Sequence, residues 1–341
     1  MYSWRGRGRG GGQRSRARGC LLLVLLVIVV LIVLSVMFGG FQKGTKSGSL
    51  GSGLVFHNDI NATSLSLPER VGADHGRGGL PAGNKVCHSH VMTIFDDLAA
   101  EQERLEKILT GLDEAQWSAA SAAAGWTIAD VVLHLAQTEE ASAATVTRGI
   151  PRDGQGALAW DAGGGTTDDM ADRAVRMERA AAAEEVFARW QRARQASLAA
   201  LRAADPDRPV QWVTGVLKPA TLATTRLAEH WAHGLDITEP LGIDLPDTGR
   251  LRHIAWLAHR TLPYALSVAG EPVVAVRCEL TAPDGTEVWR FGPEDAESVI
   301  TGAGGEFCRV AARRLDPARS GLKASGPYGT TVLRRVRTYA A

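Results

Sequence analysis

The hydrophobic and polar positions divide the chain into stretches with different periods, and the first is one long apolar run. Residues 20–38 read CLLLVLLVIVVLIVLSVMF and carry no charge, which is long enough for a helix across a bilayer core of about 30 Å. Six arginines precede the run, whereas Lys43 and Lys46 follow it. The positive-inside rule therefore predicts one transmembrane helix over 20–38, with residues 1–19 as a basic cytoplasmic tail. A cleaved signal peptide is the alternative, but the run exceeds the usual apolar region of about 7 to 15 residues and lacks a clear A-x-A site.

Residues 39–91 have no sustained apolar period and contain many glycine, serine and asparagine residues. This composition predicts a flexible, disordered linker rather than a folded domain. The tract Cys87-His88-Ser89-His90 has the composition of a metal-binding motif, but a flexible linker has nothing to hold its side chains in place. The sequon Asn61-Ala62-Thr63 carries meaning only in a compartment where proteins are glycosylated.

A helical period begins at Met92, where apolar residues recur at three- to four-residue spacing and predict the first helix of a bundle. Gly125-Trp126-Thr127 then introduces a second helix. Thr127 and Asp130 have the spacing of a capping box, and His134 flanks the apolar stripe of this helix. The apolar positions are Phe95, Leu98, Leu105, Ile108 and Leu112 in the first helix, and Ile128, Val131, Val132 and Leu135 in the second.

Three further helices are predicted before residue 269. A long third helix over about 168–203 carries large apolar side chains inward, and its many alanines allow close packing. The fourth covers 219–238, and the fifth covers 247–268 with a kink expected at Pro263. Short connections between long amphipathic helices indicate antiparallel neighbours. The pattern predicts a mainly α fold with a four- or five-helix bundle over residues 92–268.

After Gly270 the period changes from helical to alternating. Alternation near residues 274–281 predicts a strand. Pro283-Asp284-Gly285-Thr286 supplies turn residues before a second strand over 288–291, which predicts a hairpin.

The rest of the chain mixes helical and extended patterns. Helices are predicted near 305–314 and 329–340, with a short strand at 322–325 between them. Together with the hairpin they form a small α+β domain over 269–341. Cys278 and Cys308 are expected to pack inside it as small hydrophobic residues.

Composition narrows the classes of function. The chain has 341 residues and is 45% hydrophobic, which is enough for a sizeable core and two folded units. Its net charge is only +1, so no global field attracts nucleic acid, and no nucleic-acid partner is expected. The four cysteines (Cys20, Cys87, Cys278 and Cys308) are scattered without a CxxC pair. They indicate neither a disulfide framework nor a cysteine zinc site.

The candidate chemistry lies in the segment from Glu229 to His233, read together with His134. A carboxylate at i and an imidazole at i+4 project from one helix about 40° apart. An imidazole from a second helix completes a three-ligand face for a divalent metal such as zinc, with an open position where water or a thiol can lose its proton near neutral pH. His230 is the alternative ligand, at i, i+3 to His233. Asp236 is placed one turn later to orient the His233 imidazole from behind.

The same helix also presents a conflict. Its strongest apolar stripe, formed by Leu227, Trp231 and Leu235, points nearly opposite to Glu229 and His233. An interior site is compatible with this pattern only if the helix is covered on both faces. Histidine pairs on helices also serve as core or capping groups, so a structural role remains open here.

Residue order excludes several enzyme classes. The HExxH motif of zinc proteases places the glutamate after the first histidine, whereas Glu229 precedes both histidines of its segment. The sequence has no GxSxG elbow, no Walker loop and no GxGxxG led by a strand. His253 and His259 fall about 120° off a whole turn from each other, and we predict structural roles for them.

These residues carry a resemblance to a known family. Residues 92–341 resemble the mycothiol-dependent maleylpyruvate isomerase family, whose metal-binding domain belongs to the DinB-like four-helix bundles. The resemblance implies that His134, Glu229 and His233 bind a divalent metal, usually zinc. The tail from residue 271 onward is similar to the C-terminal α+β domains of uncharacterised members, some related to a domain of wybutosine-forming tRNA enzymes. The most specific segments are Gly125-Trp126-Thr127, Asp130 through Leu135, Glu229 through Ile237, and Leu241-Gly242.

The resemblance also implies a mechanism and partners, but no catalytic residue beyond the metal ligands. The metal would lower the pKa of a small-molecule thiol, mycothiol, and the thiolate would attack an electrophilic substrate. Expulsion of the thiol after rotation would isomerise the substrate, and its retention would make a transferase. The competing hypothesis is a non-catalytic, membrane-tethered binding module with a structural metal or none.

The predicted membrane segment bears on localisation. It favours a single-pass protein with a cytoplasmic N-terminus. The bundle would then lie outside the cytoplasm, where a cytosolic thiol would be scarce. A true start near Met92 would instead make the protein cytoplasmic and remove the anchor.

Overall fold

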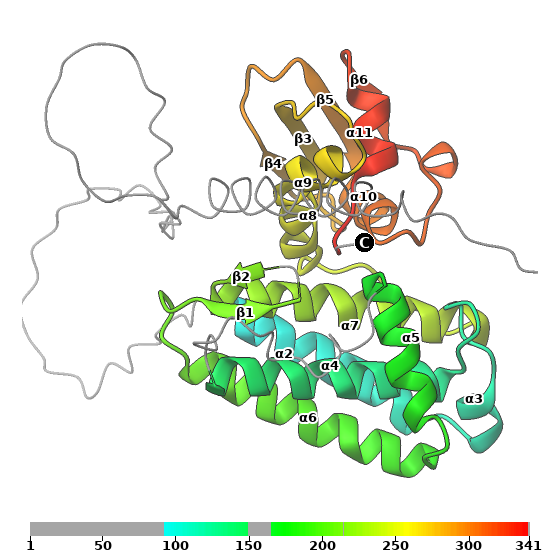
Figure 1. The fold of residues 1–341 in the computed structure, drawn as a ribbon. Helices are drawn as coiled ribbons and strands as arrows, with labels where there is room; N and C mark the ends of the chain where they lie inside the picture. The colour runs from blue at the N-terminus through cyan, green and yellow to red at the C-terminus, as the bar shows by residue number, and fades with distance from the viewer. Residues whose placement is uncertain (1–91, 149–164, 214, 340–341) are drawn as a thin grey trace, which may run out of the picture. The chain divides into compact units, whose positions relative to one another are not determined.

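The computed structural model describes residues 92–148, 165–213 and 215–339 (Figure 1). The predicted tail, transmembrane helix and linker over residues 1–91 lie outside this part and remain predictions. Among the described residues, no helix has the length and hydropathy needed to cross a bilayer.

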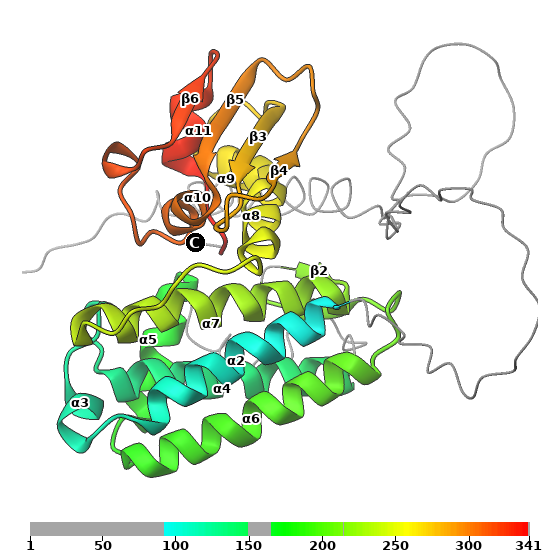
Figure 2. The same ribbon diagram turned by 180° about the vertical axis from the view of Figure 1, so that it is seen from behind.

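Four long helices form a bundle, which Figures 1 and 2 show from opposite sides: α2 (Ile94–Thr110), α4 (Ile128–Arg148), α6 (Ala183–Ala203) and α7 (Pro219–Leu241). α4 and α6 run in the same direction, since Glu140 pairs with Arg189 and Ser142 with Ser197, so the expected antiparallel arrangement of neighbours is wrong for this pair. Within it, α4 packs against α6 and α7, and α2 packs against the same two helices. The predicted bundle is therefore present, with four helices rather than five. A short helix, α3 (Glu114–Ser118), lies between α2 and α4 in the chain.

Local signals fix the ends of these helices. The backbone N–H of Thr127 donates to the Asp130 carboxylate (2.8 Å), and the Asp130 N–H donates to the Thr127 hydroxyl (3.2 Å), so the predicted capping pair of α4 is confirmed. Pro219 lies in the first turn of α7, where its missing N–H costs nothing. Gly242 ends the same helix with a left-handed backbone (φ 64°).

The predicted long third helix over 168–203 is wrong, because the structure has two helices there. α5 (Thr167–Glu178) ends before α6 begins, and it runs across α4 at a steep angle (Figure 1). Arg179 lies at the break and donates to the Asp130 carboxylate (3.0 Å) and the Gly125 carbonyl (3.1 Å). These contacts with the start of α4 hold the chain out of a continuous helix.

The predicted fifth helix is also divided. α8 (Leu251–Arg260) ends at Thr261, and α9 (Leu262–Val268) carries Pro263 in its first turn, so this proline begins a helix instead of kinking one. α8 packs against α7 and against α10 (Gly304–Ala311). It therefore joins the bundle to the C-terminal module.

A four-stranded sheet forms the centre of the C-terminal module, in the order β4-β3-β5-β6. The predicted hairpin of β3 (Val276–Thr281) and β4 (Val288–Phe291) is confirmed, and so is the short strand β6 (Lys323–Ser325). β5 (Ser298–Ala303) pairs parallel to β3 and was not predicted.

The remaining elements differ from the predictions in smaller ways. α11 (Gly329–Arg335) stops before residue 340, and Val336 after it has a non-helical backbone (ψ 137°). A small hairpin of β1 (Val210–Trp212) and β2 (Gly215–Leu217) precedes α7 and was not predicted. Cys278 and Cys308 are fully buried, as expected.

Candidate metal centre

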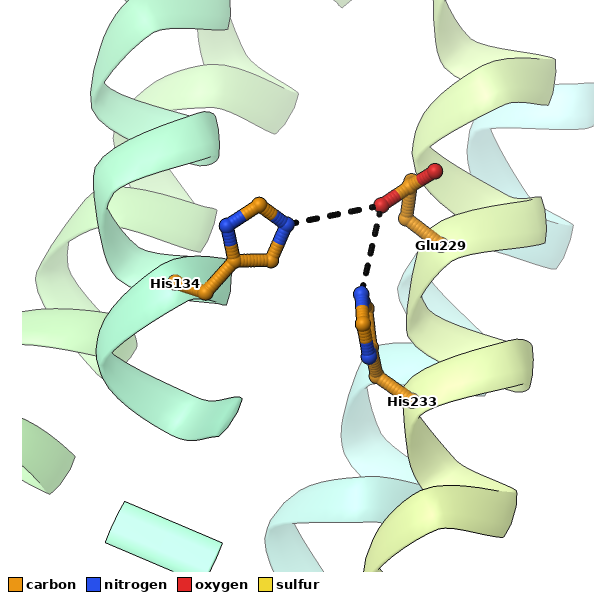
Figure 3. A group of neighbouring side chains, drawn as sticks. All are labelled: His134, Glu229 and His233. Atoms are coloured by element: carbon orange, nitrogen blue, oxygen red, sulfur yellow. Dashed lines mark ion pairs between the residues drawn. The ribbon is translucent and has the colours of Figure 1, made fainter. Parts of the chain in front are cut away.

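Three predicted ligands meet between α4 and α7. Glu229 Oε2 lies 3.7 Å from His134 Nε2 and 3.5 Å from His233 Nε2. One ligand atom from each residue lies within 4.8 Å of the other two. Figure 3 shows both imidazoles pointing at the same carboxylate oxygen.

Packing resolves the conflict between the site and the apolar stripe of α7. This helix contacts α2, α4, α6 and α8, and Leu222 and Arg226 on the ligand side are as buried as Leu227 and Trp231 on the other. α7 is thus covered on both faces, which is the condition the sequence set for an interior site. Glu229 keeps 27% of its side-chain exposure, so the site opens to solvent at this residue.

An aromatic ring covers the two histidines. Trp126 lies 5.2 Å from the His134 ring and 6.4 Å from the His233 ring, between centroids. Its indole N–H donates to the Asp172 carboxylate at 3.1 Å. The tryptophan therefore restricts how both imidazoles can rotate, and it keeps apolar surface beside the centre.

Each candidate ligand has a shifted pKa. Burial raises the pKa of Glu229, but hydrogen bonds from His134 and His233 outweigh burial and hold it well below its usual range. Burial lowers the pKa of His134. Burial also disfavours charged His233, but hydrogen bonds to Asp236 and Glu229 outweigh it and raise the pKa of that imidazole. The centre thus combines an anionic carboxylate with a neutral His134 ring.

Asp236, predicted to orient His233, contacts that imidazole, and its supporting role remains a prediction. His233 Nδ1 lies 2.9 Å from Asp236 Oδ2. The guanidinium of Arg314, in the C-terminal module, donates two hydrogen bonds to the same carboxylate. One runs from Nε to Oδ1 (3.0 Å) and the other from Nη2 to Oδ2 (2.5 Å). Sequence reasoning missed Arg314, since 78 residues separate it from Asp236 and no local pattern marks it.

His230, the alternative ligand, lies outside the group formed by His134, Glu229 and His233. Its Nδ1 lies 2.8 Å from the Arg226 carbonyl, and its Nε2 accepts a hydrogen bond from the Trp190 indole (3.2 Å). Both ring nitrogens are therefore in use on the interior side of α7. His253 (2.8 Å from Asp97) and His259 (2.9 Å from the Val276 carbonyl) take the structural roles predicted for them.

The buried His230 gives a testable dependence of stability on pH. Burial lowers its pKa to about 3, below the usual value of about 6.5 for an unfolded chain. As pH falls below about 6.5, His230 takes up a proton in the unfolded state but not in the folded state. The free energy of unfolding therefore decreases. The free energy of unfolding of the metal-free natural protein, measured in urea, should fall by about 2 kcal/mol more between pH 7.5 and pH 5 than that of the His230→Gln variant.

The comparison of these two proteins removes the effect of other titrating groups. Burial raises the pKa of Glu139, so its protonation at low pH increases the free energy of unfolding, opposite to the effect of His230. Glu139 is present in both proteins. Parallel stability curves for the two proteins would contradict the prediction.

The donor set fits a divalent metal. Two ligands bound to one tetrahedral zinc at about 2.0 to 2.2 Å are roughly 3.4 Å apart, which matches the two distances from Glu229 Oε2. Two imidazoles and one carboxylate are also ligands that zinc accepts in sites with an open position. The fold and the site thus define a helical-bundle protein with an interior centre of two histidines and one glutamate.

Comparison with known proteins identifies the family. Residues 98–238 match the family model described as the mycothiol maleylpyruvate isomerase N-terminal domain. The uncharacterized proteins MT0041 and Rv0036c of Mycobacterium tuberculosis are each 34% identical to the chain over 222 residues, which cover 64% of this chain and 84% of each relative. The chain belongs to the mycothiol maleylpyruvate isomerase family, as its motifs predicted.

Solved structures show a more distant likeness. The crystal structure of the mycothiol-dependent maleylpyruvate isomerase has a TM-score of 0.49 and 17% sequence identity, and the match covers 69% of this chain and 95% of that chain. A histidine-to-alanine mutant of that isomerase has a TM-score of 0.47 over the same shares. The predicted likeness of the C-terminal module to a wybutosine-type domain remains a prediction.

Proposed function

We propose that the protein binds a divalent metal, zinc in the first instance, at His134, Glu229 and His233, and uses it for thiol-dependent isomerase or transferase chemistry. The convergence of these three side chains from two helices carries the proposal. Membership of the mycothiol maleylpyruvate isomerase family supports mycothiol as the thiol and an electrophilic small molecule as its reaction partner.

Each residue at the centre would have a separate role in this chemistry. A zinc ion held there would lower the pKa of a thiol in its open position. Glu229 would supply negative charge to the cation, while Asp236, 2.9 Å from Nδ1 of His233, would hold the proton there and leave Nε2 free to bind the metal. Trp126 keeps one side of the centre apolar, which strengthens the electrostatic interactions inside it.

Metal analysis of the full-length protein tests this proposal first. We expect near-stoichiometric zinc in the natural protein and its loss in the His134→Ala and His233→Ala variants. The matched control is His253→Ala, since His253 pairs with Asp97 away from the centre. A folded, metal-free natural protein would overturn the metal proposal and favour the binding-module hypothesis.

Turnover tests the chemical part separately. Mycothiol and a panel of activated double-bond electrophiles should show zinc-dependent isomerisation or conjugation in the natural protein. Zinc binding without turnover across the panel would leave a metal-binding protein and remove the enzymatic assignment.

A further inference from the structure

Helix α5 lies across α4 beside the metal centre, and little of its surface is buried there (Figure 1). Val175 is packed in the apolar core, whereas the other residues of α5 are partly or fully exposed. A short helix with so little buried surface gains little free energy from packing, so its position depends on specific contacts. α5 can therefore move away from α4 at lower cost than the four long helices can.

The contacts of α5 with α4 lie on both sides of His134. Gln137, three residues after His134, donates from its amide to the Ala174 carbonyl (3.0 Å). Asp130, four residues before His134, accepts from Arg179 at the end of α5 (3.0 Å). Residues at these spacings share one face of a helix with His134. α5 therefore lies along the face of α4 that carries the first candidate ligand.

Trp126 connects α5 to the metal centre. Its indole N–H donates to Asp172 on α5 (3.1 Å), and its ring lies 5.2 Å from the His134 ring and 6.4 Å from the His233 ring, between centroids. The two imidazole side chains are 10% and 12% exposed, whereas Trp126 is partly exposed. The indole thus shields both imidazoles from solvent.

Local hydrogen bonds fix the backbone of Trp126. Its N–H donates to the Ala123 carbonyl (3.1 Å), and its carbonyl accepts from the Ser121 N–H (2.9 Å). Trp126 can therefore uncover the histidines by rotation of its side chain without a change in the turn that carries it. The hydrogen bond to Asp172 opposes this rotation.

We propose that Trp126 and α5 form a gate over the metal centre, and that the hydrogen bond between Asp172 and Trp126 holds the gate closed. With the bond made, the indole covers the imidazoles; with the bond broken, small molecules reach the centre. Gates of this kind admit reactants and then exclude water. The inference rests on the proposed function in one respect, that the molecules admitted are the metal and the small-molecule thiol. Asp172 is then a positioning residue, since it acts through Trp126.

Modification of histidines in the metal-free, full-length protein tests the gate without relying on a metal. Diethyl pyrocarbonate modifies imidazoles, and peptide mass spectrometry measures the rate at each histidine. We expect Asp172→Ala to increase the rates at His134 and His233 by about three- to tenfold, the factor that loss of one net hydrogen bond produces in an equilibrium. The buried His230 and the more exposed His253 are internal controls and should keep their natural rates.

Three further variants separate the hydrogen bond from other effects of this substitution. Asp172 also pairs with Arg176 (2.5 Å), so Arg176→Met removes that ion pair, leaves the indole bond and should react like the natural protein. Asp172→Asn keeps an acceptor oxygen and should also react like the natural protein. Trp126→Phe keeps an aromatic ring but loses the donor, and it should react like Asp172→Ala.

Two results would overturn the gate. One is equal rates at His134 and His233 in the natural protein and in Asp172→Ala. The other is a parallel increase at His230, because this buried ring reacts only when the bundle itself opens. The increase would then report a destabilised fold instead of a gate.

Zinc kinetics separate this inference from the proposed function. Zinc with equal affinity for the open and closed states keeps its dissociation constant when the gate is loosened, so Asp172→Ala should bind and release zinc about three- to tenfold faster at natural affinity. Weaker affinity with an unchanged binding rate would make Asp172 a support for the ligands and overturn the gate. The expected histidine rates in a natural protein that binds no zinc would overturn the metal centre alone.

Discussion

Replacing Glu229 by glutamine should lower the affinity of the protein for zinc more than any other single isosteric change. Glutamine keeps the shape of the side chain but removes the negative charge that now lies between His134 and His233. Loss of groups that merely support a ligand costs about 10- to 100-fold in metal affinity, so loss of a charged ligand should exceed this range. Competition for zinc against a chromophoric chelator measures the effect.

The chain offers a control for this substitution on the same helix. Glu239 lies ten residues further along α7 and is exposed, so Glu239→Gln removes the same charge without touching the centre. Both variants should keep the helical circular dichroism of the natural protein, because neither changes the apolar core. Equal zinc affinity in the two variants would show that Glu229 is not a ligand.

The three candidate ligands could be brought together from the sequence because their spacing is local. Glu229 and His233 share a face of one helix by periodicity alone, and the capping pair of Thr127 and Asp130 fixes where α4 begins and hence where His134 lies. The partner of His230 Nε2 could be seen only in the fold, since Trp190 comes from another helix, 40 residues away in sequence.

The break between α5 and α6 and the pairing of β5 with β3 were not predicted. In both places, contacts between residues far apart in sequence override the local preference. The stretch from Arg179 to Ala183 has the alanine content of a good helix, yet contacts of Arg179 with Asp130 and Gly125 end α5 there. β5 contains Gly302 and has little alternation, so its parallel pairing with β3 could not be read from its own residues.

Arg314 shows the same limit at the candidate site, and it leads to the second large effect. Its guanidinium binds both oxygens of Asp236, which is 2% exposed. Replacing Arg314 by methionine would leave this buried carboxylate with His233 as its remaining charged partner. Breaking a buried ion pair in this way costs about 3 to 5 kcal/mol of stability, which chemical unfolding of the metal-free protein would measure.

Two comparisons separate the loss of the pair from loss of a surface charge. Arg319→Met, an exposed position in the same module, should leave stability unchanged, and adding Asp236→Asn to Arg314→Met should recover part of the loss because the buried charge is gone. Arg314→Met should also weaken zinc by about 10- to 100-fold, since Asp236 then holds the His233 imidazole less firmly. A stable Arg314→Met protein with natural zinc affinity would show that the C-terminal module does not support the centre through Asp236.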